Sequence, residues 1–144
     1  MKLVTQQTKV ERCSDCRGII KRGDCATAVI ASILGLDLDE VPRFVDAGSG
    51  MFFYVAEWLA RRVPPGVAAA REDLPPDPVY AAGVSPRDPS VRHAVVWSGG
   101  PNGAVVWDPH PDRTGLAGDP LTFAVIARDP SACASCGQGE DATR

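Results

Sequence analysis

The chain lacks a basic excess and any long apolar segment. Its 144 residues include 15 Lys and Arg against 18 Asp and Glu, which gives a formal net charge of −3. Nucleic-acid-binding proteins usually carry a basic stripe, so this charge balance argues against a nucleic-acid partner. No segment approaches the roughly 20 apolar residues that span a bilayer, and residues 1–7 lack an apolar signal-peptide core. We therefore expect a cytoplasmic protein without a membrane partner, in the host cytoplasm if a phage encodes it.

An internal repeat is also lacking, and the order of patterns predicts a single α+β domain. The chain is long enough to bury one core. We expect helices over residues 25–34 and 51–62, and strands over residues 79–82, 93–97, 104–108 and 121–128. Helices followed by antiparallel strands predict N-terminal helices packed on a small antiparallel sheet. We expect this domain to span residues 1–136, and the polar residues 137–144 to form a disordered tail.

Cys25 stands where the first helix is expected to begin. The run from Cys25 to Leu34 is apolar, and Gly35 is a common signal for the end of a helix. A thiol at the first turn lies at the positive end of the helix dipole, which stabilises the nucleophilic thiolate. Asp24 is expected to cap this helix. The alternative is that Cys25 is an ordinary buried thiol.

A hairpin is predicted to bring a histidine and a carboxylate together. Residues 93–97 and 104–108 are β-branched and aromatic, and residues 98–103 between them are rich in turn formers. A symmetric loop sets His93 directly opposite Asp108, with Cβ atoms roughly 4.5–5.5 Å apart on one face. Asp108 could then orient His93 as a general base. A register displaced by one residue would place them on opposite faces.

Other residues compete for these roles. His110 lies between two prolines in an expected loop and is the alternative base. Asp112 is a weaker candidate for the orienting carboxylate. Asp108 could instead do no more than begin an Asp-Pro turn.

Four of the five cysteines form two C-x-x-C pairs, each followed closely by glycine: Cys13 with Cys16, and Cys133 with Cys136. Two such turns predict a structural zinc site with four thiolate ligands and no open coordination position. The site would join the two ends of the chain and leave Cys25 unpaired. Two local disulfides or redox-active pairs are the alternatives, but a cytoplasmic chain without a thioredoxin-like pattern disfavours both.

The residues around Cys25, His93 and Asp108 resemble the papain-like cysteine peptidase superfamily. The resemblance spans about residues 3–128. It rests on Gly23-Asp24-Cys25, the following helix that ends in Leu34-Gly35-Leu36, Ser85-Pro86-Arg87, His93-Ala94-Val95-Val96 and Val106-Trp107-Asp108-Pro109-His110-Pro111. It is greatest to the C39-like peptidase branch, in the small standalone form found in bacteria and phages. It implies a papain-like fold in which Cys25 is the nucleophile, His93 the general base and Asp108 the residue that orients His93.

The resemblance also implies a glutamine that stabilises the oxyanion. In the family this glutamine precedes the cysteine by several residues, and here Gln6 or Gln7 would take the role, with Gln7 preferred. The chain departs from the family pattern because the first C-x-x-C pair lies between these glutamines and Cys25. The cysteine pairs are not a family hallmark either, so they indicate a specialised branch.

These patterns predict a hydrolase that cleaves a peptide, isopeptide or related acyl bond in a peptide or protein substrate. Cys25 thiolate would attack the carbonyl carbon, and His93 would carry the proton. Two other functions use the same residues. One is a catalytically silent module that binds a peptide or protein in a papain-like cleft, and the other is an acyl or amide transferase with the same triad. The sequence does not predict the oligomeric state.

Overall fold

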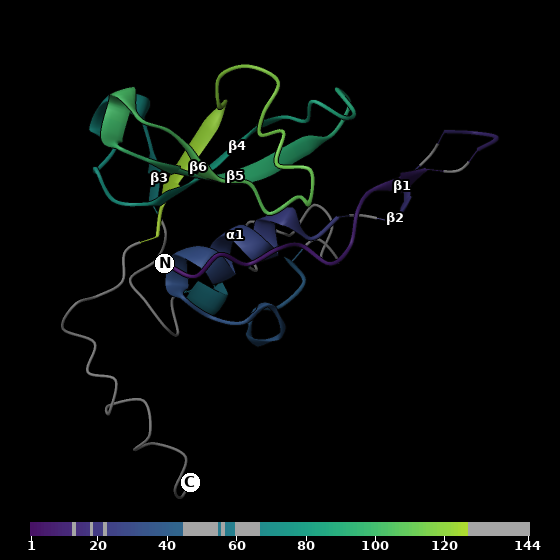
Figure 1. The fold of residues 1–144 in the computed structure, drawn as a ribbon, viewed down its shortest axis with the longest axis horizontal. Coiled ribbons are helices and arrows are strands. Elements are labelled where there is room, and N and C mark those ends of the chain that lie inside the picture. The colour runs from purple at the N-terminus through teal and green to yellow at the C-terminus, as the bar shows by residue number, and fades with distance from the viewer. Residues whose placement is uncertain are drawn as a thin grey trace, which may run out of the picture.

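The computed structural model describes residues 1–12, 14–17, 19–21, 23–44, 55, 57–59 and 67–126. Within them, a five-stranded antiparallel sheet has the order β3-β7-β4-β5-β6. Its strands are β3 (Val67–Ala69), β4 (Val79–Val84), β5 (Arg92–Ser98), β6 (Ala104–Trp107) and β7 (Thr122–Val125). The helix α1 (Cys25–Leu34) packs on this sheet, mainly against β5 (Figure 1). The expected combination of helix and small antiparallel sheet is therefore confirmed.

A separate two-stranded ribbon precedes α1. It consists of β1 (Glu11–Arg12) and β2 (Ile19–Lys21), which pair antiparallel. Figure 1 shows the ribbon projecting away from α1 and the sheet. Short 3-10 turns occur at Leu38–Glu40, Arg71–Asp73 and Gly100–Asn102.

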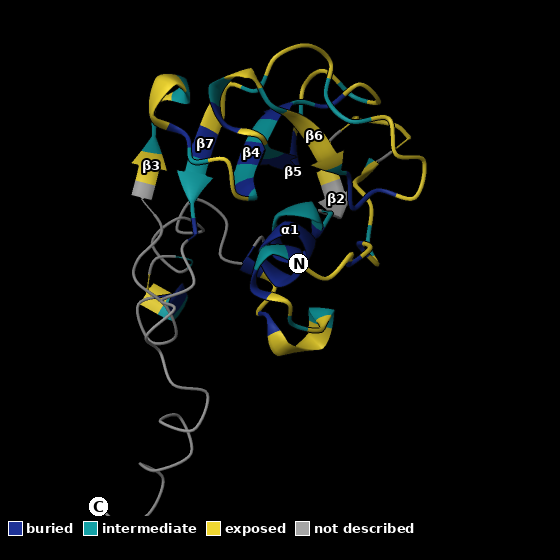
Figure 2. Ribbon diagram, turned by 60° about the vertical axis from the view of Figure 1, so that its left-hand side comes forward, coloured by how far each residue is buried: buried dark blue, intermediate teal, exposed yellow. Residues whose placement is uncertain are grey.

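The helix α1 is buried on almost every side. Its sequence consists mainly of alanine and larger aliphatic residues, and seven of its ten residues are buried (Figure 2). It ends at Gly35, which adopts a left-handed φ of 75° that glycine reaches without strain. The N–H of the following Leu36 donates to the Ala31 carbonyl at 3.0 Å. The predicted bounds of this helix are confirmed.

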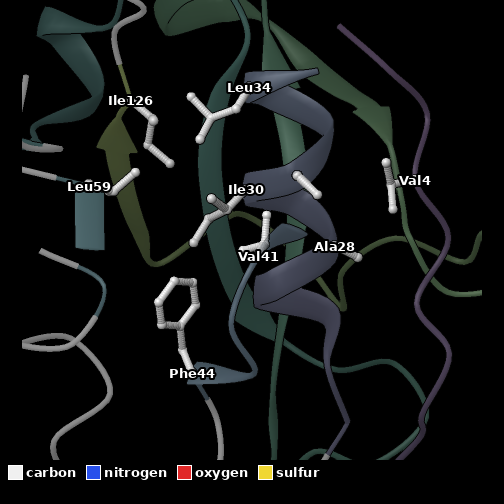
Figure 3. Close-up of a cluster of buried hydrophobic side chains, with 9 residues drawn as sticks. Val4, Ala28, Ile30, Leu34, Val41, Phe44, Leu59 and Ile126 are labelled. Carbon is white, nitrogen blue, oxygen red and sulfur yellow. The ribbon is translucent and has the colours of Figure 1, made fainter. Parts of the chain in front are cut away.

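Apolar side chains pack on both sides of α1 and on both faces of the sheet. Val29 of α1 meets Ala94, Val96 and Trp107 of the sheet. A second cluster surrounds the rest of α1 and contains Val4, Ile30, Leu34, Val41, Phe44, Leu59 and Ile126 (Figure 3). A third cluster covers the opposite sheet face and contains Leu74, Val79, Ala81, Val95, Trp97 and Phe123. The sheet therefore lies between two apolar layers, which fixes the strands that position the site.

The helix predicted over residues 51–62 is described only in part. Residues 55 and 57–59 are helical. Leu59 is buried, and Val55 and Trp58 pack against the cluster around α1, with the Trp58 ring 5.7 Å from Phe44. The predicted apolar face is confirmed for these three residues, while Phe52 lies outside the described residues.

The register predicted for the β5–β6 hairpin is wrong. A symmetric loop pairs Trp97 with Ala104, whereas the structure pairs Trp97 with Val105 and Val96 with Trp107. The displacement is one residue at Trp97, and it grows to two at Val96 because Val106 is an extra residue without a partner on β5, a β-bulge. Two residues are one full period of side-chain alternation. The residues beyond the bulge therefore point to the same faces of the sheet as in the predicted register.

The segment before β1 runs along α1 and the end of β6. The Lys2 N–H donates to the Ser32 carbonyl at 3.0 Å, and the Val4 N–H donates to Ser32 Oγ at 3.0 Å. Trp107 Nε1 in turn donates to the Val4 carbonyl at 3.0 Å. These bonds fix the segment that carries Gln6. In the described part of the chain, no helix has both the length and the apolar character needed to cross a membrane.

Candidate active site

A cleft of about 720 Å³ lies where α1 begins and β5 begins. Its walls come from the N-terminal segment, the β1–β2 ribbon, the first residues of α1, and strands β4 and β5. Cys25, His93 and Gln6 all line it, and so does His110 from the loop after β6. Residues distant in sequence therefore meet in one cavity.

Cys25 is the first residue of α1 and is partly buried. It packs against the cluster of Val29, Ala94 and Val96 that joins α1 to β5. The first turn of α1 contains no acidic residue, so no carboxylate there opposes a negative charge on sulfur. The sulfur therefore lies at the end of the helix where backbone N–H groups have no helical acceptors.

His93 and Asp108 form a buried hydrogen-bonded pair. His93 Nε2 lies 2.7 Å from Asp108 Oδ1, and their side chains are 5% and 3% exposed. Asp108 directly follows β6 instead of pairing with His93 in the ladder. The predicted contact is therefore present, although it is reached through the bulge and not through the predicted register.

Three donors converge on the Asp108 carboxylate. Besides His93, the His110 N–H donates to Oδ1 at 2.8 Å and the Gly115 N–H donates to Oδ2 at 2.7 Å. Gly115 has a left-handed φ of 72°. Burial opposes ionisation, but the hydrogen bonds from His93, His110 and Gly115 outweigh it and lower the pKa of Asp108. Asp108 is thus a carboxylate held in one orientation.

Arg113 fixes the loop that presents Asp108. Its guanidinium stacks 3.8 Å from the centre of the Trp107 ring and donates to the Asp108 carbonyl. It also reaches Thr5 Oγ1 at 3.0 Å in the N-terminal segment. One side chain therefore joins the end of β6, the following loop and the segment that carries Gln6.

The environment of His93 favours its imidazolium form. Burial disfavours the charge, but hydrogen bonds with Asp108 and Cys25 and the negative charges of both residues raise its pKa to about 9. Because Nε2 is bonded to Asp108, Nδ1 is the ring nitrogen that remains for Cys25. At neutral pH His93 therefore carries a positive charge and lies between the Asp108 carboxylate and Cys25.

Buried and exposed residues alternate along the N-terminal segment. Val4 and Gln6 are buried, whereas Leu3, Thr5 and Gln7 are exposed. Gln6 lines the cleft and Gln7 does not. The structure brings Gln6 to the other site residues, and it does not bring Gln7, which the sequence preferred.

Main-chain and side-chain bonds hold Gln6 in the cleft wall. Its N–H donates to the Pro109 carbonyl at 2.9 Å, and its Nε2 donates to the Thr8 carbonyl at 2.7 Å. Its buried Oε1 accepts no hydrogen bond from the described residues. The amide group therefore has hydrogen-bonding capacity that the surrounding chain does not use.

Asp24 does not cap α1 as predicted. It occupies the N-cap position but makes no side-chain hydrogen bond to the helix. Its carboxylate instead accepts the N–H groups of Gln7 at 3.3 Å and Thr8 at 3.0 Å. The physical reason is that the N-terminal segment passes close to the start of α1 and its unpaired donors compete for this carboxylate. Asp24 thereby ties the segment that carries Gln6 to the residue before Cys25.

His110 and Asp112, the alternative base and orienter, also lie near the cleft but contact each other. His110 Nδ1 is 2.8 Å from Asp112 Oδ1, and the His110 ring centre is 6.2 Å from that of His93. Burial and the charges of Arg87 and Lys9 lower the pKa of His110 despite the opposing effect of Asp112. Cys25 acts on the pKa of His93 and is not among the causes of the pKa shift of His110.

Of the four cysteines predicted to bind zinc, only Cys16 falls within the described residues. It is exposed in the turn of residues 14–16 between β1 and β2. Cys13, Cys133 and Cys136 lie outside the described residues. Within the part of the chain that is described, no three potential metal ligands are grouped together. The zinc site stays a prediction.

Two residues at the cleft, Tyr80 and Arg87, were assigned no role from the sequence. Tyr80 of β4 lies close enough to Cys25 that burial, and then the charge on sulfur, raises the pKa of its phenol. Arg87 lies 3.9 Å from Asp108 Oδ2 and 2.7 Å from Asp112 Oδ1. Tyr80 is part of an ordinary β-strand pattern and Arg87 of a Pro-rich turn, so only the folded chain brings them to the site.

No family model, curated protein or solved structure matches this chain.

Proposed function

We propose that this protein is a papain-like cysteine hydrolase that cleaves a peptide, isopeptide or related acyl bond. The observation that carries the proposal is that Cys25 and His93 line one cleft and that His93 is bonded to the buried Asp108 at 2.7 Å. A nucleophile, a base and a carboxylate that orients the base are the groups this chemistry requires. The cysteine-bearing helix packed on the histidine-bearing strand supports the papain-like relationship.

Acylation begins with attack of Cys25 Sγ on the substrate carbonyl carbon. The tetrahedral intermediate collapses as the carbon–nitrogen bond breaks, and the His93 imidazolium gives its proton to the leaving amine. A water molecule then attacks the thioester while neutral His93 takes its proton. Release of the carboxylic acid product regenerates the thiolate and the imidazolium.

Two donors at the cleft are suited to the oxyanion of the tetrahedral intermediate. The backbone N–H of Cys25 is at the first position of α1, where helix geometry provides no acceptor. The Gln6 amide is held in the cleft wall, and its Nε2 has a second N–H beside the one bonded to Thr8. Such preorganised donors typically contribute about 10²- to 10³-fold in rate. Gln6 therefore takes the role in place of Gln7.

Substitution of the nucleophile tests the proposal. Wild-type protein and the Cys25→Ala variant are incubated with a mixed peptide library in ¹⁸O-labelled water, and new carboxyl termini are identified by mass spectrometry. We expect labelled products from wild type and none from Cys25→Ala, whose circular dichroism and melting temperature stay close to wild type because alanine suits a helix start.

Two further measurements separate the competing functions. Iodoacetamide should label Cys25 stoichiometrically near neutral pH, as peptide mapping would show. An unreactive Cys25 together with no products would favour a binding module. Products formed only when amines are added would instead identify a transferase.

A further inference from the structure

The wall of the cleft is cationic in a chain whose net charge is negative. Lys9, Arg12, Arg87 and Arg92 line the cavity, and among the described residues Asp88 is the single acidic residue that lines it. The whole chain, by contrast, carries a formal charge of −3. The positive charge is therefore concentrated at the site and is not a general property of the surface.

Two of these four cations already have ionic partners. Arg12 Nε lies 2.6 Å from Asp88 Oδ2, and Arg87 is paired with Asp112. Lys9 and Arg92, by contrast, form no ion pair among the described residues. Their charges remain available to a ligand in the cleft.

The free cations flank the reacting groups. Arg92 directly precedes His93 at the start of β5, and Lys9 precedes β1 on the segment that follows Gln6. The charge of Lys9 extends to His110 across the cleft, where it contributes to the lowered pKa of that imidazole. Two separate segments thus bring unpaired positive charge to the same cavity as Cys25.

We propose that the cleft selects acidic peptides, with Lys9 and Arg92 binding a substrate carboxylate close to the scissile bond. This inference rests on the proposed function and narrows its substrate class. A carboxylate held in a partly enclosed cavity interacts with these cations more strongly than in bulk water. The overall negative charge of the chain disfavours a long polyanion such as nucleic acid at the same place.

The rate of alkylation of Cys25 depends on the electrostatic potential in the cleft, and it can be measured without a known substrate. Iodoacetate and iodoacetamide react with the same sulfur and differ in charge, so the ratio of their rate constants reports the local potential. The ratio is measured at pH 7 and low salt by peptide mapping of Cys25 in wild type, Lys9→Gln and Arg92→Gln. Lys2→Gln is the matched control, because Lys2 pairs with Asp37 outside the cleft.

We expect each cleft substitution to lower the iodoacetate preference about threefold, and the Lys2 control to leave it unchanged. The difference should shrink in 0.5 M salt because exposed charges are screened. Rapid labelling by iodoacetamide with the same ratio in all four proteins would overturn the substrate inference and leave the hydrolase proposal standing. Failure of both reagents to label Cys25 would overturn both.

A pair of fluorogenic peptide pools extends the test to turnover. The pools differ only in carrying Asp or Asn beside the scissile amide. Wild type should hydrolyse the Asp pool with the lower KM, and Lys9→Gln and Arg92→Gln should remove that difference. Equal KM values for the two pools in wild type would contradict the inference.

Discussion

The α1–β5–β6 region and the β1–β2 ribbon both border the cleft, but the first is buried and the second is largely exposed. The first supplies Cys25, His93 and Asp108 from elements packed in apolar clusters, and the side chains of His93 and Asp108 are almost fully buried. The second is largely exposed and is attached to the β4–β5 connection through the Arg12–Asp88 ion pair. For the proposed hydrolase, the difference means that the core holds the reacting groups in place, while the ribbon contributes charge and covers the cleft.

The largest effect is expected from a substitution in the buried region, at Asp108. Asp108→Asn removes the charge that stabilises the His93 imidazolium and should lower kcat by about 100-fold or more. Turnover of the peptide pools provides the measurement, and the melting temperature shows whether the fold persists. The matched control is Asp112→Asn, since that carboxylate is 40% exposed and contacts His110 instead of His93. A silent Asp108→Asn and a damaging Asp112→Asn would reverse the assignment of the orienting residue.

A bound zinc ion would reduce the difference between the two regions, because it would make the ribbon contribute to the stability of the fold. If Cys13, Cys16, Cys133 and Cys136 bind zinc, folding and metal binding are coupled, and a strong chelator should lower the melting temperature by several degrees or more. Cys133→Ser should have a similar effect while Cys25 stays reactive. Elemental analysis of protein purified under reducing conditions should give one zinc per chain. Absence of zinc from such a preparation would end the prediction.

The pH dependence of the free energy of unfolding should reveal the titration of the buried His93. His93 has its pKa raised from 6.5 to about 9 in the folded chain, so the folded state binds its proton more tightly than the unfolded state. The resulting stabilisation is fully present below pH 6.5 and is lost as pH rises to 9, by roughly 1–3 kcal/mol. Urea unfolding between pH 6 and 10 measures it. A His93→Gln variant should show a flatter profile, and an unchanged profile would exclude His93 as its source.

The smallest effect is expected at the ribbon. Arg12 bonds Asp88 and Ser90, and it donates to the Arg17 carbonyl at 2.7 Å. Arg12 and Asp88 are 28% and 29% exposed, so Arg12→Ala should cost at most about 1 kcal/mol of stability. It should still alter access to the cleft and raise KM more than it lowers kcat. A fall in kcat with KM unchanged would mean that the ribbon positions the reacting groups.

The sequence predicted the elements better than the way they meet. The helix from Cys25 to Leu34 and the two hairpin strands were recognisable because apolar periodicity and turn residues are local signals. The bulge at Val106 was not, because nothing in a run of valines distinguishes a residue that leaves the ladder from one that stays in it.

The glutamine choice failed for a similar reason. Leu3 and Val4 are both apolar, so the sequence did not reveal which set of alternating residues faces inward, and this decides between Gln6 and Gln7. Asp24 was misassigned because the N–H groups that donate to its carboxylate belong to Thr8 and Gln7, which are 16 and 17 residues earlier in the chain. Such contacts depend on tertiary packing that propensity does not encode.

Val106 is a residue that the hairpin can lose without moving Asp108. Because Val106 has no partner on β5, its removal would leave Trp97 paired with Val105 and Val96 paired with Trp107, and Asp108 would keep its place beside His93. A homologue whose hairpin is one residue shorter at this point can therefore retain the contact that the proposed mechanism requires.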